Sequence, residues 1–140
     1  MNVKTILLPV DGSAHSDKAA DYAVGMAKTL RASIVLLQCR KPVPNELGEP
    51  NLQWVLDHYT KDSEEIIEPY RKQIEAEGIP CKDMVIGGRP AEVIDDVARS
   101  EKADIIIMGS KGKSDFEGFM LGSVTHKVLH IAPCPVLVVK

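Results

Sequence analysis

The 140-residue chain is 44% hydrophobic and 26% charged, with a net charge of −3 at pH 7, which is typical of one globular domain. The negative charge and an aromatic content of only 4% disfavour a surface for nucleic acid or anionic membranes. No apolar run is long enough for a signal peptide or a membrane-spanning helix, so we expect one cytoplasmic domain over residues 1–140.

Five short segments that are apolar on both faces predict the strands of a buried parallel sheet. They cover residues 5–10, 34–37, 84–86, 105–108 and 136–139. An antiparallel sheet with one solvated face would show stricter alternation of apolar and polar residues.

Helical spacing of apolar residues predicts a helix in each interval between these strands. Ser13 or Ser16 is placed to cap the first helix. Residues 41–51 are rich in proline and polar residues and are expected to form a mobile surface loop. The second helix follows over about 52–74, and Pro69 inside it should kink or divide it.

The third and fourth helices have clear boundary signals. Pro90 fits the first turn of the third helix, and the fourth should run from about 122 to 131, before Pro133 ends it.

The order β-α-β-α-β-α-β-α-β predicts an α/β, Rossmann-like, doubly wound five-stranded parallel sheet with helices on both faces. Ligands bind such sheets beyond the carboxyl ends of the strands. We therefore expect a site at the segments after the first, second and fourth strands.

The triplet Gly112-Lys113-Ser114 resembles the end of a P-loop. A P-loop needs its first glycine five residues before Gly112, where the chain has Ile107 inside a predicted strand. The P-loop interpretation therefore fails on spacing.

The glycines fit a different pattern, G-x2-G-x9-G-S, formed by Gly109, Gly112, Gly122 and Ser123. Glycines after a strand let backbone N–H groups approach phosphate oxygens, and the start of the fourth helix favours an anion. Two such elements suit a polyphosphate. Alternatively, the glycines only form a turn and permit close packing, and Ser123 only caps its own helix.

Several ordered segments are similar to the universal stress proteins of the ATP-binding kind. They are ILLPVDGS, ASIVLLQ, GGRPAEVI, ADIIIMGSKG and LGSVTHKVLHIAPCPVLVVK, and together they span the chain. The resemblance implies an adenine nucleotide alpha hydrolase-like fold, ATP with Mg²⁺ as ligand, and a homodimer that regulates the stress response. The dimer would form through the terminal strand, from Val136 to Lys140, where pairing would also cover an apolar edge.

The resemblance also implies which positions contact the nucleotide. The positions that would contact the nucleoside are Pro9, Val10, Asp11, Cys39 and Met108. The positions that would contact the phosphates are Gly109, Lys111, Gly112, Gly122, Ser123, Val124 and Thr125. Cys39 would act through its backbone. Asp11 would take the ribose or the metal ion, or else only cap the following helix.

Asp115 and Glu117 depart from this pattern, because related loops often carry basic residues there. Carboxylates near a triphosphate oppose its binding unless a divalent cation intervenes. We expect weaker or more Mg²⁺-dependent nucleotide binding as a result. The sequence does not indicate in which direction these two side chains point.

The other metal and thiol candidates favour ordinary structural roles. His126 and His130 have the spacing of a two-histidine metal face but no third ligand, and His15 and His58 have no identifiable partner. The three cysteines form no disulfide framework and no CxxC motif. Cys39 and Cys134 lie in apolar segments and are expected to act as small buried hydrophobes.

The expected function is that of an ATP-binding regulatory dimer with an unknown protein partner and at most slow ATP hydrolysis. No activated nucleophile or arginine finger is evident. An alternative is a module of the same fold that holds no nucleotide and acts through protein contacts. An adenylylating enzyme is disfavoured because VDGSAHSD replaces the glycine-rich loop expected after the first strand.

Overall fold

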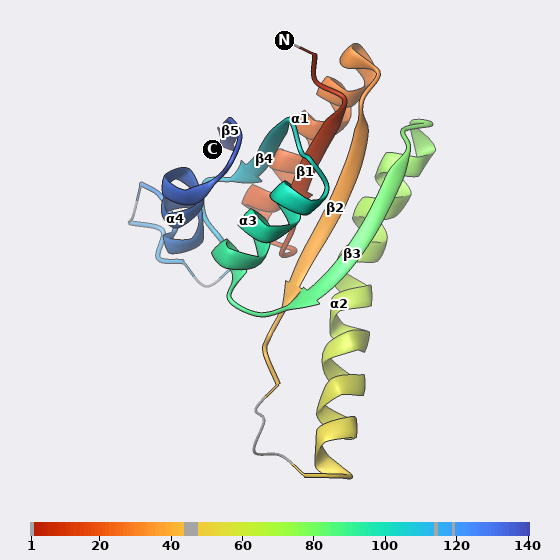
Figure 1. Cartoon of the computed structure of the whole chain (residues 1–140), viewed down its shortest axis with the longest axis vertical. Coiled ribbons are helices and arrows are strands. Elements are labelled where there is room, and N and C mark those ends of the chain that lie inside the picture. The colour runs from red at the N-terminus through yellow and green to blue at the C-terminus, as the bar shows by residue number, and fades with distance from the viewer. Residues whose placement is uncertain (1, 44–47, 114, 119) are drawn as a thin grey trace.

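The computed structural model describes residues 2–43, 48–113, 115–118 and 120–140. Its elements alternate along the chain as β1 (Thr5–Pro9), α1 (Ala14–Leu30), β2 (Ser33–Arg40), α2 (Asn51–Ala76), β3 (Cys81–Gly87), α3 (Pro90–Ser100), β4 (Ile105–Gly109), α4 (Ser123–Ile131) and β5 (Val136–Val139). The five strands form one parallel sheet in the order β3-β2-β1-β4-β5 (Figure 1). The predicted fold class is confirmed.

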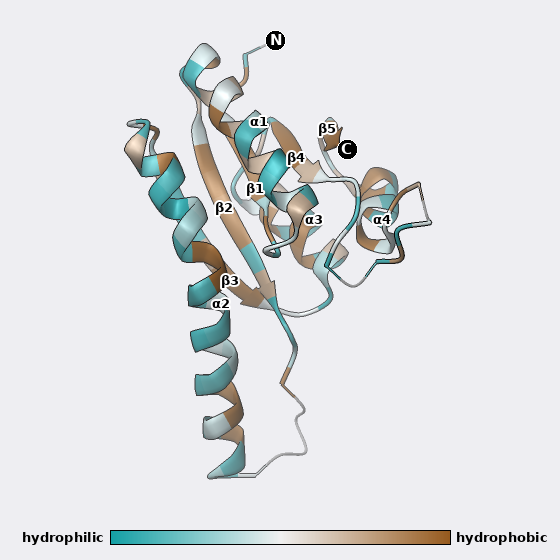
Figure 2. Ribbon diagram, turned by 180° about the vertical axis from the view of Figure 1, so that it is seen from behind, coloured by the Kyte–Doolittle hydropathy of each residue, from teal (hydrophilic) through white to brown (hydrophobic). Residues whose placement is uncertain are grey.

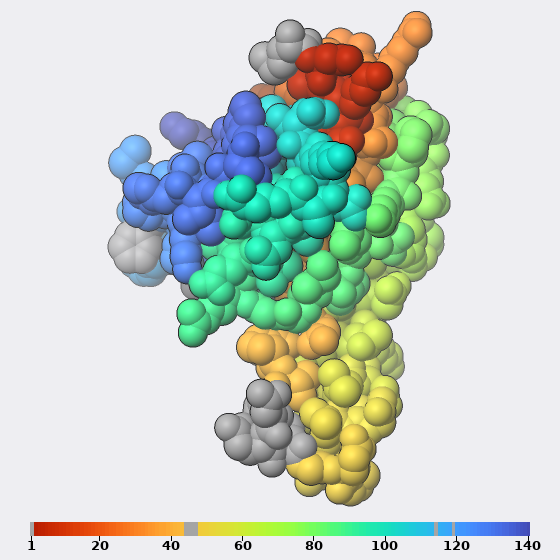
Figure 3. Space-filling model, viewed as in Figure 1, coloured from red at the N-terminus to blue at the C-terminus, as the bar shows by residue number. Residues whose placement is uncertain are grey.

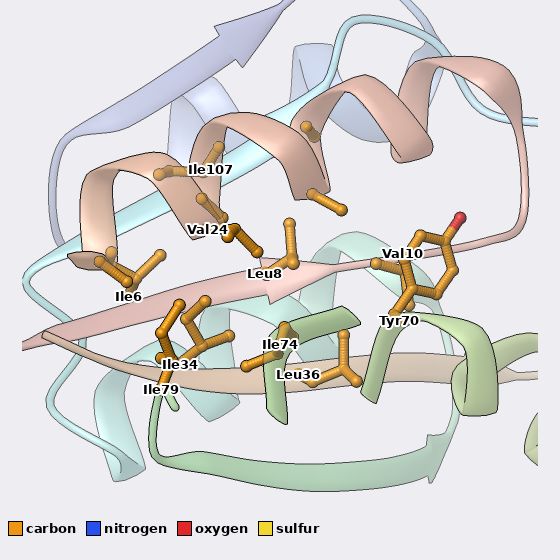
Figure 4. Close-up of a cluster of buried hydrophobic side chains, with 14 of the residues drawn as sticks. Ile6, Leu8, Val10, Val24, Ile34, Leu36, Tyr70, Ile74, Ile79 and Ile107 are labelled. Carbon is orange, nitrogen blue, oxygen red and sulfur yellow. The ribbon is translucent and has the colours of Figure 1, made fainter. Parts of the chain in front are cut away.

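The core has two halves, one on each face of the sheet. Ile6 and Leu8 of β1 pack with α1 and α2, while Leu7 between them packs with α3 and α4. This alternation is a consequence of the two-residue repeat of a strand. Figure 4 shows the first half, in which Tyr70 and Ile74 of α2 lie against the sheet, and Figure 2 shows that the strands are mainly hydrophobic.

The helix boundaries follow the sequence signals with one correction. Ser13 is the cap of α1, because its side chain accepts a hydrogen bond from the Ser16 backbone N–H at 3.1 Å. Pro90 is the first residue of α3. Of the two effects expected of Pro69, a kink or a division, the division is wrong because α2 is unbroken from Asn51 to Ala76. Pro69 is exposed, so the carbonyl that loses its N–H partner can be hydrated.

The N-terminal part of α2 extends beyond the sheet, as Figure 3 shows at the lower end of the molecule. The predicted surface loop over 41–51 includes residues 44–47, which lie outside the described residues, and α2 begins at the end of this segment. Among the described residues, no helix is long and apolar enough to cross a membrane.

Candidate functional site: a cavity at the carboxyl edge of the sheet

A cavity of about 580 Å³ lies where β1, β2 and β4 end, between α2 on one side and the first turns of α3 and α4 on the other. The order of the strands reverses between β1 and β4, which is the place where doubly wound folds bind ligands. All the predicted site residues except Gly122 line it: Pro9, Val10, Asp11, Cys39, Met108, Gly109, Lys111, Gly112, Ser123, Val124 and Thr125.

Asp11 connects the end of β1 to the glycine loop. Its Oδ1 accepts a hydrogen bond from the Ser13 N–H at 2.9 Å, and its Oδ2 accepts one from the Lys113 N–H at 2.9 Å. The first bond holds the turn before α1, whose cap is Ser13 and not Asp11. The second, across 102 positions of chain, was not expected. It fixes the glycine loop against the end of β1.

The buried Ser16, in the first turn of α1, stabilises the position of Asp11. Its hydroxyl accepts a hydrogen bond from the Asp11 N–H at 3.2 Å and lies 3.1 Å from the Tyr70 hydroxyl oxygen, to which it can donate its own proton. Tyr70 also lies 2.6 Å from Asp17 Oδ1. Burial, and then the Asp17 carboxylate, raise the pKa of Tyr70 above its usual value. The phenol therefore stays protonated and holds the start of α1 against α2.

The two ends of the glycine loop are tied to the sheet and to each other. The Ser110 N–H donates to the Val139 carbonyl at 2.8 Å, and the Gly122 N–H donates to the Ser110 carbonyl at 2.7 Å. The buried Thr125 hydroxyl donates to the Gly109 carbonyl at 2.8 Å. The Thr125 side chain thus has a structural bond, which leaves its backbone as the part available to a ligand.

The first turn of α4 supplies the second anion-binding element expected from the sequence. Gly122 is the N-cap residue and has no side chain with which to bond the first N–H groups of the helix. Ser123 is the exposed first residue of α4, so it does not cap the helix. The residues of this turn, Ser123, Val124 and Thr125, all line the cavity. Uncapped N–H groups and the helix dipole both favour an anion here.

The two acidic loop residues point in different directions. Asp115 lines the cavity, and its Oδ2 accepts a hydrogen bond from the Gly112 N–H at 2.5 Å. Glu117 is exposed, and its carbonyl accepts a bond from Lys111 Nζ at 2.8 Å. The Lys111 side chain is only 13% exposed and is held by these contacts with Glu117. Ser114 lies outside the described residues.

The wall at the end of β2 contains residues that the sequence analysis missed. Gln38 is buried in the sheet, and its Oε1 has no hydrogen-bond partner within the described part of the chain. Tyr59 and Ser63 reach the cavity from α2. A glutamine inside an otherwise apolar strand was the available signal. Burial raises the pKa of the Cys39 thiol to about 12, so this thiol is neutral and not a nucleophile.

The histidines have partners that the sequence did not predict. His15 Nε2 lies 3.7 Å from Glu117 Oε1, and His58 stacks on Trp54 with ring centroids 5.4 Å apart. His126 and His130 are exposed and face each other edge-on, at 4.8 Å. Among the described residues, no cluster of three or more metal-ligating side chains occurs.

The cavity combines an apolar wall with a set of backbone donors. Val10, Ile94 and Met108 offer apolar surface for a base, and the glycine loop and the start of α4 offer backbone donors for phosphates. Both Asp11 carboxylate oxygens already accept hydrogen bonds. Asp11 alone is therefore no metal site, although it can add one ligand to a magnesium ion carried by a nucleotide.

Comparisons with known proteins agree with this architecture. The model of the universal stress protein family matches residues 2–140. "Universal stress protein in QAH/OAS sulfhydrylase 3′ region" of Thermus aquaticus is 38% identical over 138 residues, covering 98% of each chain. The structure of protein MJ0577, a universal stress protein of Methanocaldococcus jannaschii, superposes with a TM-score of 0.91 at 31% identity, over 100% of this chain and 97% of the other.

A more distant structure contains a nucleotide. The universal stress protein of Archaeoglobus fulgidus, solved in complex with dAMP, superposes with a TM-score of 0.73 at 20% identity and full coverage of both chains. This degree of identity supports the shared fold alone.

Proposed function

The chain belongs to the universal stress protein family, and we propose that its cavity binds an adenine nucleotide, with Mg²⁺-ATP as the expected ligand. The observation that carries this proposal is the convergence of eleven of the twelve predicted contact residues on one cavity at the carboxyl edge of the sheet. The dAMP bound to the relative from A. fulgidus is consistent with it. Binding of the nucleotide would regulate a stress response.

The direct test is to denature freshly purified protein and identify any released nucleotide by mass spectrometry. Near-stoichiometric adenine nucleotide, or binding of added Mg²⁺-ATP by calorimetry to the emptied protein, would support the proposal. A protein that is purified empty and binds neither AMP nor Mg²⁺-ATP would overturn it. The alternative, a module that acts through protein contacts alone, would then be favoured.

We also propose that the protein is a homodimer paired through β5, which is an edge strand. The Ile106 N–H donates to the Pro135 carbonyl, and the Ser110 N–H donates to the Val139 carbonyl. Backbone groups of alternate residues point to opposite sides of a strand. The Val138 N–H therefore faces the free edge and is available to a second chain.

Replacement of Val138 by proline removes this outward donor and keeps the bonds to β4, because edge strands tolerate proline. Light scattering should report a monomer for Val138→Pro and a dimer for the matched control Val138→Thr, which retains the N–H. A dimeric Val138→Pro, or a monomeric native protein, would disprove pairing through this edge.

A further inference from the structure

The Asp115 carboxylate lies between Gly112 and Gly122, two glycines of the motif that was predicted to bind phosphate. Its Oδ2 accepts the Gly112 N–H at 2.5 Å. The same oxygen lies directly against the Cα atom of Gly122, so close that a Cβ built there would collide with it. A carboxylate thus lies between two glycines of the motif, because neither has a side chain in the way. These are the features that phosphate loops offer to an anion.

The next N–H along the loop is also taken by a carboxylate of the chain. Asp11 Oδ2 accepts the Lys113 N–H at 2.9 Å. A Cβ built on Gly112 would lie 3.0 Å from this oxygen and 3.2 Å from Asp115 Oδ2. Two negative groups therefore converge on one point of the loop.

Lys111, one of the two lysines of the loop, pairs with Glu117 and not with these two carboxylates. Lys111 Nζ donates to the Glu117 carbonyl at 2.8 Å and lies 3.7 Å from the Glu117 carboxylate. The segment that carries Asp115 and Glu117 thus engages the Gly112 N–H and Lys111, while the first N–H groups of α4 are not capped by a side chain. A phosphate can bind to the Gly112 N–H only when Asp115 leaves it. The displaced carboxylate, three positions along the chain, then stays close to the bound phosphate and repels it.

We propose that Asp115 determines which adenine ligands the site accepts, because its carboxylate acts as an internal substitute for a phosphate group. The inference rests on the proposed nucleotide binding. Adenosine leaves Asp115 in place and is unaffected by it. AMP must displace Asp115 against modest repulsion. Free ATP brings the most negative charge and is disfavoured most, whereas Mg²⁺ offsets this charge and restores binding.

The test compares Asp115→Asn with the native chain by calorimetry, using adenosine, AMP and ATP, each in EDTA and in excess Mg²⁺. The matched control is Asp96→Asn, which makes the same change of charge at an exposed residue of α3 outside the cavity. A second variant, Asp115→Ser, also removes the charge, and the circular dichroism and melting midpoint of each variant verify that it folds.

The gain in affinity of the Asp115 variants should increase with the number of phosphate groups on the ligand. Without Mg²⁺, both Asp115 variants should bind ATP at least about tenfold more tightly than the native chain, equivalent to about 1.4 kcal/mol. The gain should be smaller for AMP, less than about twofold for adenosine, and reduced for ATP when Mg²⁺ is present. Asp96→Asn should match the native chain throughout.

Two outcomes would overturn the inference in different ways. If the native chain binds AMP or Mg²⁺-ATP and the Asp115 variants show no gain for free ATP, or an equal gain for all three ligands, Asp115 does not select among ligands, while the proposed function stands. If the native chain and both variants bind none of the three ligands, the proposed function fails and this inference fails with it.

Discussion

Gly109 ends β4 directly against the first turn of α1, and its replacement by alanine tests whether this close approach positions the site. A Cβ built on Gly109 would lie 2.8 Å from the His15 carbonyl carbon and 2.9 Å from the His15 Cβ and carbonyl oxygen. Two of these atoms belong to backbone, so no side-chain rotation relieves the contact. The end of β4 and the start of α1 must move apart, which should cost about 1–3 kcal/mol of folding free energy.

Gly25 provides the matched control, because it lies in α1 and, apart from its own turns of helix, no atom of the described residues comes within 4 Å of a built Cβ. Gly25→Ala should stabilise the protein by about 0.5–1 kcal/mol, since glycine inside a helix costs that much relative to alanine. The two glycine-to-alanine variants should therefore differ by at least about 1.5 kcal/mol.

Urea denaturation at 25 °C measures this difference. With a slope of about 2 kcal/mol/M, the midpoints of the two variants should be separated by at least about 0.8 M, with Gly109→Ala below the native chain and Gly25→Ala above it. Coinciding midpoints would show that β4 moves away from α1 without cost. The close approach would then not be the reason for glycine at position 109.

Three further changes follow from single contacts. Asp11→Asn replaces one carboxylate oxygen by an amide group, whose N–H then faces the backbone N–H of either Ser13 or Lys113. This change should lower the free energy of unfolding by about 1–2 kcal/mol, as measured in urea melts. Asp104 accepts two backbone N–H bonds that hold its pKa below the usual 3.8; its stability advantage over Asp104→Asn should be complete above about pH 4 and disappear as the pH falls through that lowered pKa, as followed by melting midpoints. Ile74→Ala opens a fully buried site and should cost about 2–5 kcal/mol in urea melts, whereas Leu30→Ala, at a side chain that is 46% exposed, should cost much less.

The apolar segments predicted β1, β4 and β5 almost in full, but only parts of β2 and β3. The predicted 105–108 and 136–139 agree with β4 and β5 to within one residue. The predicted 84–86, in contrast, is only part of β3, which also contains the exposed Lys82 and Asp83. β3 is an edge strand, and Asp83 pairs there with Arg71 of α2 at 2.9 Å. Apolar pattern alone does not detect a strand whose outer residues are polar.

The sequence predicted the location of the site better than it predicted the contacts that its side chains make. The ends of parallel strands meet at one edge of a sheet, so the strand order alone brings Asp11, Cys39 and Gly109 together. The directions of Lys111 and Asp115 depend instead on which backbone groups of the loop are free to bond. That choice is made in three dimensions and leaves no periodic pattern in the sequence.

The presence of the glycine motif therefore does not by itself show that the loop binds phosphate tightly. Gly122→Val, alone and combined with Asp115→Asn, tests whether Gly122 provides the space for a phosphate. The backbone of Gly122 has φ −73° and ψ 160°, which valine adopts readily. Its Cβ would collide with Asp115 and lie 3.1 Å from Lys111 Cα. The valine should thus displace the carboxylate and fill the phosphate position together. Calorimetry should show that Gly122→Val loses AMP and Mg²⁺-ATP binding, and that adding Asp115→Asn to it does not restore the loss. Native affinity in Gly122→Val would place the phosphates elsewhere in the cavity.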